Sequence, residues 1–182
     1  MQDNFKISDI FDKNINFLIG SGASYGLLPT LALKILDAEG HSQTIESLST
    51  HFDNSGKSGL KALLFMHYFL TCIKPAIEMN YDALVAPAQT NVLTNYTSFL
   101  GTILQMLKRR SGQQNKCNIF TTNYDGCLEN AADSLLKRNS DDFILNDGTR
   151  GFLKLFLHAK NYDLCVQKTG ILEKNIIGIP QI

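Results

Sequence analysis

Two short stretches of this sequence combine residue types that can bind an anion and act on a sugar. The first is a turn of small residues, Gly20, Ser21, Gly22, Ala23 and Ser24, with Gly26 two positions later. Glycine leaves no Cβ in front of the backbone, so N–H groups and serine hydroxyls can contact phosphate oxygens. The spacing is a relaxed form of the dinucleotide-binding fingerprint. A compact turn that binds nothing is the alternative interpretation.

The second stretch follows the apolar pair Ile119 and Phe120. It consists of five polar residues in a row, Thr121, Thr122, Asn123, Tyr124 and Asp125. In open α/β sheets, ligands bind at the carboxyl ends of strands, so these side chains indicate one wall of a polar site. The alternative is that Asn123 or Asp125 caps a helix beginning near Gly126. A cap, however, needs only one such residue.

The elements that position these stretches are strands. Residues 15–19 form a nearly continuous apolar run, which predicts a strand buried on both faces, as in a parallel sheet. Residues 117–121 predict a second strand close to the first. We expect helices at 27–40, at 60–80 with an interruption at Pro75, at 89–110 and at 126–138, and a mobile loop at 41–60. Short strand-like pieces follow residue 139.

This order predicts an α/β fold, a three-layer Rossmann-like parallel sheet with an inserted helical cap. We expect one domain over residues 1–182, with the helical insertion at about 41–115. A standard dehydrogenase would place an acidic residue after a second strand about 20 residues beyond the turn. Asp37 and Glu39 lie at that distance but inside an expected helix, which argues against that class.

Composition narrows the class of protein further. The 182 residues carry a formal net charge of zero, so no overall basic surface indicates nucleic acid. The N-terminus is acidic and polar, unlike a signal peptide, and we expect no segment near the ~20 apolar residues of a membrane span. The cysteines, Cys72, Cys117, Cys127 and Cys165, have no zinc spacing. They predict reduced, mostly buried thiols, no metal and a cytoplasmic protein.

The two stretches together, with Pro29 after Gly26, resemble the sirtuin-type fold that consumes NAD. Sirtuin deacylases carry a GAG-x-S loop, a G-I-P segment and a later T-Q-N-I-D. The T-T-N-Y-D of this chain is closer to the sirtuin-like NAD hydrolases of bacterial anti-phage defence proteins, as are N-D-G at 146–148 and I-P at 179–180. The deacylase zinc module is missing, and Thr-Leu-Ala follows Pro29 where deacylases have Phe-Arg.

The resemblance implies that NAD is the substrate and that the nicotinamide–ribose bond is cleaved. Residues Gly20 to Ser24 would wrap the pyrophosphate, Asn123 would orient the ribose and a water, and Asp125 would bind the carboxamide. Pro29, Thr121, Thr122 and Tyr124 would complete the cofactor-binding set. Nicotinamide leaves readily because its ring nitrogen is cationic. The protein must therefore position water and stabilise an oxocarbenium-like transition state.

The family uses a histidine followed by glycine as general base, and no histidine here has that context. His67 is expected in the core or at its boundary, His41 and His51 in solvent, and His158 is a weak stand-in. We therefore expect the base to lie beyond Ile182, the chain to be truncated at its C-terminus, and the 182-residue fragment to be inactive. The resemblance also implies a homo-oligomer and an ATPase or sensor partner. A non-catalytic NAD or ADP-ribose sensor and a helical interaction module remain the alternatives.

Overall fold

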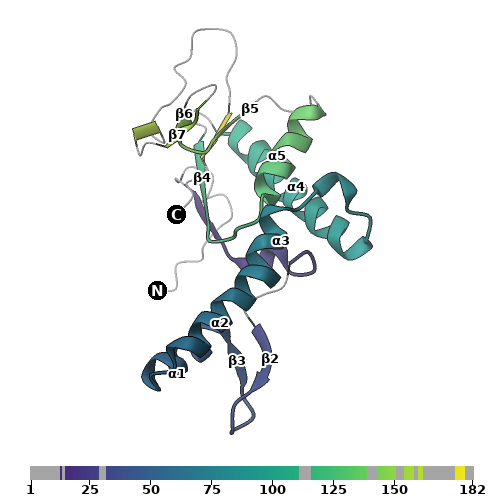
Figure 1. Ribbon diagram of the computed structural model, residues 1–182. Coiled ribbons are helices and arrows are strands. Elements are labelled where there is room, and N and C mark those ends of the chain that lie inside the picture. Colours follow the sequence, from purple (N-terminus) through teal and green to yellow (C-terminus); the bar gives the residue numbers. More distant parts are fainter. Residues whose placement is uncertain are drawn as a thin grey trace, which may run out of the picture. The chain divides into compact units, whose positions relative to one another are not determined.

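The computed structural model describes residues 13, 15–28, 32–110, 116–138, 143–150, 154–157, 160–161 and 175–178 (Figure 1). The chain forms two compact units. The first comprises Met1–Gly20, Leu93–Thr122 and Cys127–Ile182, and the second comprises Ser21–Val92 and Asn123–Gly126. The single domain over 1–182, with its insertion at about 41–115, stays a prediction.

A small parallel sheet organises the first unit. Its strands are β1 (Asn16–Ile19), β4 (Lys116–Thr121), β8 (Asn175–Gly178) and β5 (Phe143–Asn146), in the order β1-β4-β8-β5. All three neighbouring pairs are parallel, and Ile19 is paired with Thr121. The expected α/β class and the neighbouring strands at 15–19 and 117–121 are therefore confirmed. Two short antiparallel strands, β6 (Thr149–Arg150) and β7 (Phe156–Leu157), also belong to this unit.

Two helices supply most of the core of the first unit. They are α5 (Cys127–Lys137) and the part of α4 (Pro87–Lys108) from Leu93 onward, and both were expected. The ring of Phe17 in β1 meets Phe99 of α4 edge-on, with 5.1 Å between centroids. The α5 core positions recur at helical spacing, as the amphipathic pattern requires. The buried apolar side chains include Leu100, Ile103, Leu104, Leu107, Ile119, Leu128, Ala131, Ala132, Leu135 and Phe143.

The sheet is not covered on both faces along β1 and β4. In β4, buried Cys117 and Ile119 alternate with half-buried neighbours, and in β1 the Leu18 side chain is 75% exposed. Such alternation is typical of strands with one covered face. The expectation that residues 15–19 are buried on both faces is therefore wrong, because an apolar residue also occupies the open face.

The side chain of a buried arginine bonds to the backbone at the starts of β1 and β4. Arg110 follows α4 and is 8% exposed. Its guanidinium donates one hydrogen bond to the carbonyl of Lys13, just before β1, and another to the carbonyl of Lys116 at 3.5 Å, where β4 begins. One side chain thereby ties together the starts of the two strands whose ends lead into the second unit.

The second unit is built from a hairpin and helices. The hairpin strands are β2 (Ala32–Leu36) and β3 (Ser42–Thr44), which pair antiparallel. After them come α1 (Ile45–Asn54), α2 (Ser58–Tyr68), the π-helical turn η3 (Phe69–Ile73), α3 (Lys74–Ile77) and the 3₁₀ turn η4 (Tyr81–Ala83). Helix α1 packs against α2 and β3. Figure 1 shows the hairpin running beside the long helical segment.

The helix expected at 27–40 is wrong, because residues 32–36 form strand β2. The turn after β2 has strong local reasons to form. Asp37 Oδ1 accepts the N–H groups of Glu39 and His41, and Gly40 has a φ of +86°, a conformation that glycine adopts without strain. Asp37 and Glu39 thus lie in a hairpin turn. A dehydrogenase would need the acidic residue after a second strand of the sheet. Strand β2 does precede Asp37, but it pairs with β3 and not with β1, so that arrangement is not formed by these residues.

The mobile loop expected at 41–60 is also wrong, because this stretch contains β3, α1 and the start of α2. Helix α1 begins with a reciprocal capping box. The N–H of Ser47 donates to Thr44 Oγ1 at 3.2 Å, and the N–H of Thr44 donates to Ser47 Oγ at 2.9 Å. Such a cap satisfies two backbone donors that a helix start otherwise leaves unpaired. Serine replaces the more usual glutamate, which made the signal easy to miss.

The apolar helix expected at 60–80 is present, and the chain continues helically through Pro75 from α2 into α3. The π-helical turn η3 directly precedes the proline turn. A wider turn there eases the clash between a proline ring and the carbonyl four residues earlier. The segment Ser58–Ile77 contains an 18-residue window with a mean hydropathy of 1.3 and is long and apolar enough to cross a membrane. We expected no segment with the length and apolar composition of a membrane span, and this expectation is therefore wrong.

Candidate functional site

The glycine turn is a short 3₁₀ helix, η2 (Ser21–Ser24), directly after the chain leaves β1. Its first three residues are exposed and Ser24 is buried. The carbonyl of Ser24 accepts the N–H groups of Leu27 at 3.0 Å and Leu28 at 3.2 Å, which closes the turn. Gly26, with a φ of +97°, is the glycine that this backbone needs.

Gly22 has no such backbone requirement. Its φ is not in the left-handed region, and a Cβ built on it meets no heavy atom of the described chain within 4 Å. The same holds for Gly20. Neither backbone strain nor crowding within the protein explains glycine at these two positions. A surface left bare in this way lets a ligand approach the backbone closely.

Helical residues of the second unit hold the polar loop that follows β4. The hydroxyl of Tyr81, in η4, accepts the N–H of Gly126 at 2.6 Å. Tyr68 of α2 lies beside Tyr124. Burial raises the pKa of the Tyr68 hydroxyl, and the neighbouring Tyr124 raises it further. The loop from Asn123 to Gly126 is thus anchored by Tyr81, a residue more than forty positions earlier in the chain.

Ser24 joins the glycine turn to the polar loop. Its hydroxyl donates to Asp125 Oδ2 at 2.7 Å and accepts the amide of Asn123, Nδ2 to Oγ, at 3.3 Å. These partners lie 101 and 99 positions away in sequence, and Ser24 is 2% exposed. Side chains that were predicted as site residues in two separate stretches of the sequence therefore form one cluster, which we call the Ser24–Asn123–Asp125 cluster.

The cluster has a definite direction of hydrogen bonding. The amide donates to the hydroxyl, and the hydroxyl donates to the carboxylate. A hydrogen bond to an ionised acceptor is shorter and stronger than a neutral one, and a chain of such bonds polarises each member. The arrangement fixes the orientation of Asn123 and Asp125 within the unit. Preorganised polar groups of this kind stabilise developing charge without reorganising during the reaction.

Ser24 differs from its neighbours in the turn. The resemblance assigns Gly20 to Ser24 to a pyrophosphate as a group, but the Ser24 hydroxyl is engaged by Asp125 and Asn123. Its side chain therefore contacts the polar loop, whereas Ser21 to Ala23 are exposed to solvent.

The remaining predicted site residues are three from the first unit, Tyr124 from the second unit, and residues that are not described. Gly20, Thr121 and Thr122 lie at the ends of β1 and β4, where the N–H of Thr122 donates to the carbonyl of Ile19 at 3.3 Å. From these paired strand ends the chain enters the second unit at Ser21 and again at Asn123. Tyr124 is 60% exposed. Pro29 and His158 lie outside the described residues.

The histidine expectations are partly confirmed. His41 and His51 are exposed, as expected, but His67 is exposed too, so the expectation that it lies in the core or at its boundary is wrong. It lies on α2, where Leu64 is the buried residue, because little of this apolar helix packs within its unit. No histidine among the described residues is assigned here as a general base.

Tyr68 and Tyr81 are the site residues that sequence reasoning missed. Each lies in the helical region, far in sequence from both motifs, and neither belongs to a sequence motif that indicates a binding or catalytic site. Tyrosine combines an apolar ring with a polar tip, so a half-buried tyrosine in a helix is an ordinary boundary residue until its partner is known. Only the tertiary contacts to Tyr124 and Gly126 reveal their role.

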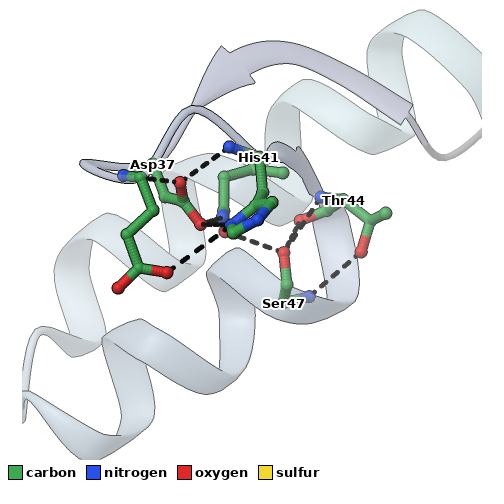
Figure 2. A network of polar contacts seen from close by, with 6 residues as sticks. Asp37, His41, Thr44 and Ser47 are labelled. Carbon is green, nitrogen blue, oxygen red and sulfur yellow. Dashed lines mark hydrogen bonds and ion pairs between the residues drawn. The ribbon is translucent and has the colours of Figure 1, made fainter.

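A second polar cluster lies in the β2–β3 turn and at the start of α1 (Figure 2). His41 Nδ1 is 3.3 Å from Asp37 Oδ2 and 3.6 Å from Glu39 Oε2, and Gln43 donates to the same Asp37 oxygen at 3.3 Å. Hydrogen bonds from the backbone N–H groups of His41 and Glu39 lower the pKa of Asp37. The three side chains offer ligand atoms within 4.8 Å of one another. All come from one exposed turn, which their contacts stabilise.

The described cysteines behave as structural thiols. Cys117 and Cys127 are buried and Cys72 is partly buried, and all three are free. The expectation of mostly buried thiols therefore holds for these positions. Burial raises the pKa of the Cys117 thiol to about 11, so it stays protonated and unreactive at neutral pH.

The sequence matches no family model and no curated protein. The assignment of function therefore rests on the two motifs and on the contacts that bring them together.

Proposed function

We propose that this chain is an NAD-binding domain of the sirtuin-like type that, when complete, cleaves the nicotinamide–ribose bond of NAD. The observation that carries the proposal is the contact of Ser24 with Asp125 and Asn123. It brings into one cluster the two motifs on which the resemblance rests. The bare backbone at Gly22 supports the same proposal, because a pyrophosphate needs that space.

The proposed division of labour follows the positions of the residues. The exposed turn from Ser21 to Ala23, with Gly20 before it, binds the pyrophosphate through backbone N–H groups. Ser24 orients Asp125 toward the carboxamide and Asn123 toward the ribose and a water. An amide can donate and accept at once, so Asn123 suits both tasks. Pro29, Thr121, Thr122 and Tyr124 complete the proposed binding set.

The wider assignments belong to this proposal as well. We infer a three-layer Rossmann-like sheet in the complete fold, a cytoplasmic location, and a role as an anti-phage defence effector that acts by consuming NAD. We also infer assembly as a homo-oligomer, with an ATPase or sensor protein as a further partner. These inferences are supported by the resemblance of the two motifs.

Two measurements on the wild-type protein separate the proposal from its alternatives. Calorimetric titration with NAD tests binding, and chromatography of the products tests release of nicotinamide by the full-length encoded protein under activating conditions. Binding with nicotinamide release supports the hydrolase. Binding of NAD or ADP-ribose without release favours the non-catalytic sensor. Absence of both leaves the helical interaction module, with a glycine turn that is purely structural, and overturns the proposal.

A further inference from the structure

The helical segment Ser58–Ile77 of the second unit leaves much of its apolar surface exposed. In its most apolar window of 18 residues, 11% of the residues are buried. On the side away from buried Leu64, the side chains of Leu63, Met66 and Leu70 are 57–61% exposed. They recur at intervals of three and four residues, which places them in one stripe along the helix. Leu60, Phe65 and Phe69 flank the stripe and are 45–48% exposed.

The opposite side of the segment is used within the unit. Leu64 and Ala76 are buried, α1 packs against α2, and Tyr68 contacts Tyr124 of the polar loop. The segment therefore has one face with partners in its own unit and one apolar face exposed to solvent. Contiguous exposed apolar patches of more than a few hundred Å² are rare in monomers and mark interaction sites.

The exposed area fits a protein interface. At roughly 200 Å² for a whole large side chain, the stripe and its flanking residues expose on the order of 650 Å² of apolar area. One partner in a standard interface buries about 800 Å², part of which is a polar rim. The stripe therefore supplies most of what a stable dimer needs.

The charges on the segment suit a second copy of the same surface. The charged residues of 58–77 are Lys61 and Lys74. The ammonium of Lys61 lies 2.6 and 2.8 Å from the two carboxylate oxygens of Asp53, and that of Lys74 lies 3.9 Å from Glu78. Each cation already has an acidic neighbour in its own unit. Two copies related by a two-fold axis would bring no uncompensated like charges together.

The same features argue against a membrane as the occupant. A spanning helix must be apolar all round, since lipid surrounds it. Here Lys61 lies within the segment, and one face is committed to Leu64, Tyr68 and Ala76, which pack or bond within the unit. A helix that exposes an apolar surface on one side only is better suited to a protein partner than to a surrounding bilayer.

We propose that a second copy of this chain docks on the stripe formed by Leu63, Met66 and Leu70, giving a dimer with two-fold symmetry. The inference names the surface of the proposed homo-oligomer and does not depend on the NAD chemistry. It also connects assembly with the proposed site, because the segment Ser58–Ile77 carries the stripe on one side and Tyr68, the neighbour of Tyr124, on the other.

Sedimentation equilibrium over a wide range of protein concentration tests the dimer. The wild-type chain should self-associate, and Met66→Asp should weaken association at least about 30-fold, the size of an interface hot spot. Val85→Asp is the matched control, because Val85 is 87% exposed in the same unit but lies outside the helical segment. It should associate like wild type. A wild-type chain that stays monomeric, or a Met66→Asp variant that associates normally, overturns the proposal.

A second experiment keeps the test independent of any loss of folding. Residue 66 is the middle residue of the stripe, so a two-fold axis through the stripe would bring its two copies together. Met66→Cys should then cross-link to its own symmetry mate with a short bismaleimide, whereas Val85→Cys should give no more dimer than the wild-type chain. Flotation with phosphatidylcholine–phosphatidylglycerol vesicles tests whether a membrane, and not a second copy of the chain, contacts the stripe. Vesicle binding that Met66→Asp abolishes, without any self-association, would assign the stripe to a membrane and refute the dimer.

Discussion

Two polar clusters in the second unit are each built around an aspartate, and they differ in how the chain assembles them. The Ser24–Asn123–Asp125 cluster joins segments 99 and 101 positions apart, with Ser24 almost fully buried. The cluster around Asp37 joins residues within six positions of one another in an exposed hairpin turn. Both contain a carboxylate that accepts a hydrogen bond from another polar side chain, so composition alone does not distinguish them.

The difference teaches which cluster needs a functional explanation. A turn forms its own hydrogen bonds locally, and those of Asp37 hold the hairpin together. A cluster of distant residues needs closure of a long loop, at a cost in entropy that other contacts must offset. It also buries polar atoms, which is unfavourable unless each finds a partner. The long-range cluster is therefore maintained by the fold, and the short-range one is a by-product of a turn.

The largest expected effect concerns catalysis by the long-range cluster. Asn123→Ala in the full-length protein should lower the rate of nicotinamide release at least about 100-fold, because removing one positioned donor costs that much at comparable sites. Asn118→Ala is the matched control. Its amide donates to Asn16 at 2.8 Å in the sheet, outside the cluster, so turnover should be unchanged. Product chromatography measures both. Wild-type turnover in the Asn123 variant would refute its catalytic role.

The second effect concerns binding at the glycine turn. Gly22→Leu should lower the affinity for NAD or ADP-ribose at least about 10-fold, because the new side chain occupies the space proposed for the pyrophosphate. Folding should survive, since no described atom lies within 4 Å of the added Cβ. Gly101→Leu adds the same side chain to similarly open space on α4 and should bind normally. Calorimetry decides, and equal affinity in the two variants would contradict the assignment.

The third effect concerns stability and separates the two clusters directly. Ser24→Ala removes a buried donor to an ionised carboxylate, which should lower the free energy of unfolding by about 1.5–3 kcal/mol. His41→Ala in the exposed hairpin cluster should produce no measurable change. Urea unfolding of both variants gives the comparison. Equal losses would mean that burial and sequence separation do not distinguish the clusters.

A smaller loss is expected at the anchor of the polar loop. Tyr81→Phe keeps the ring and removes the hydroxyl that accepts the Gly126 N–H, so we expect a loss of about 1 kcal/mol. Amide exchange at Gly126 should become faster in this variant. Tyr25→Phe, at a side chain that is 74% exposed, serves as the control and should leave both quantities unchanged. Unaltered exchange at Gly126 in the Tyr81 variant would show that the loop needs no such anchor.

The smallest effect is the pH response of the hairpin cluster. The pKa of Asp37 is lowered from 3.8 by its hydrogen bonds, so folding favours the carboxylate. Its contribution to stability is therefore present above pH 3.8 and is lost as pH falls below that value. Asp37→Asn should melt slightly earlier than wild type at pH 7, and the difference should vanish at strongly acidic pH. A difference that grows on acidification would reverse the sign of this interpretation.

The sequence predicted the elements whose patterns are local and unambiguous. Strands β1 and β4 and helices α4 and α5 were expected within a few residues of their observed ends. Their pairing followed from the rule that motifs after parallel strands share one edge of the sheet. The contact of Ser24 with Asp125 confirms that the two motifs meet.

The hairpin and helix α1 were missed because their signals compete. The run Ala32–Leu36 is apolar at spacings that fit a helix as well as a short strand, and the deciding contacts come from the Asp37 turn. Tyr68 and Tyr81 were missed for another reason. They matter to the candidate site through their contacts with residues 124 and 126, and no local sequence pattern predicts such contacts.

The central claim is that the glycine turn and the polar loop form one binding site, and an NMR titration of the isotope-labelled chain with ADP-ribose tests it most directly. We predict that the backbone amides of Ser21 to Ser24 and of Asn123 to Gly126 shift together, with one common dissociation constant, while those of Asp37 to Gln43 stay in place. Absence of any shift, or shifts confined to the hairpin, would contradict the claim.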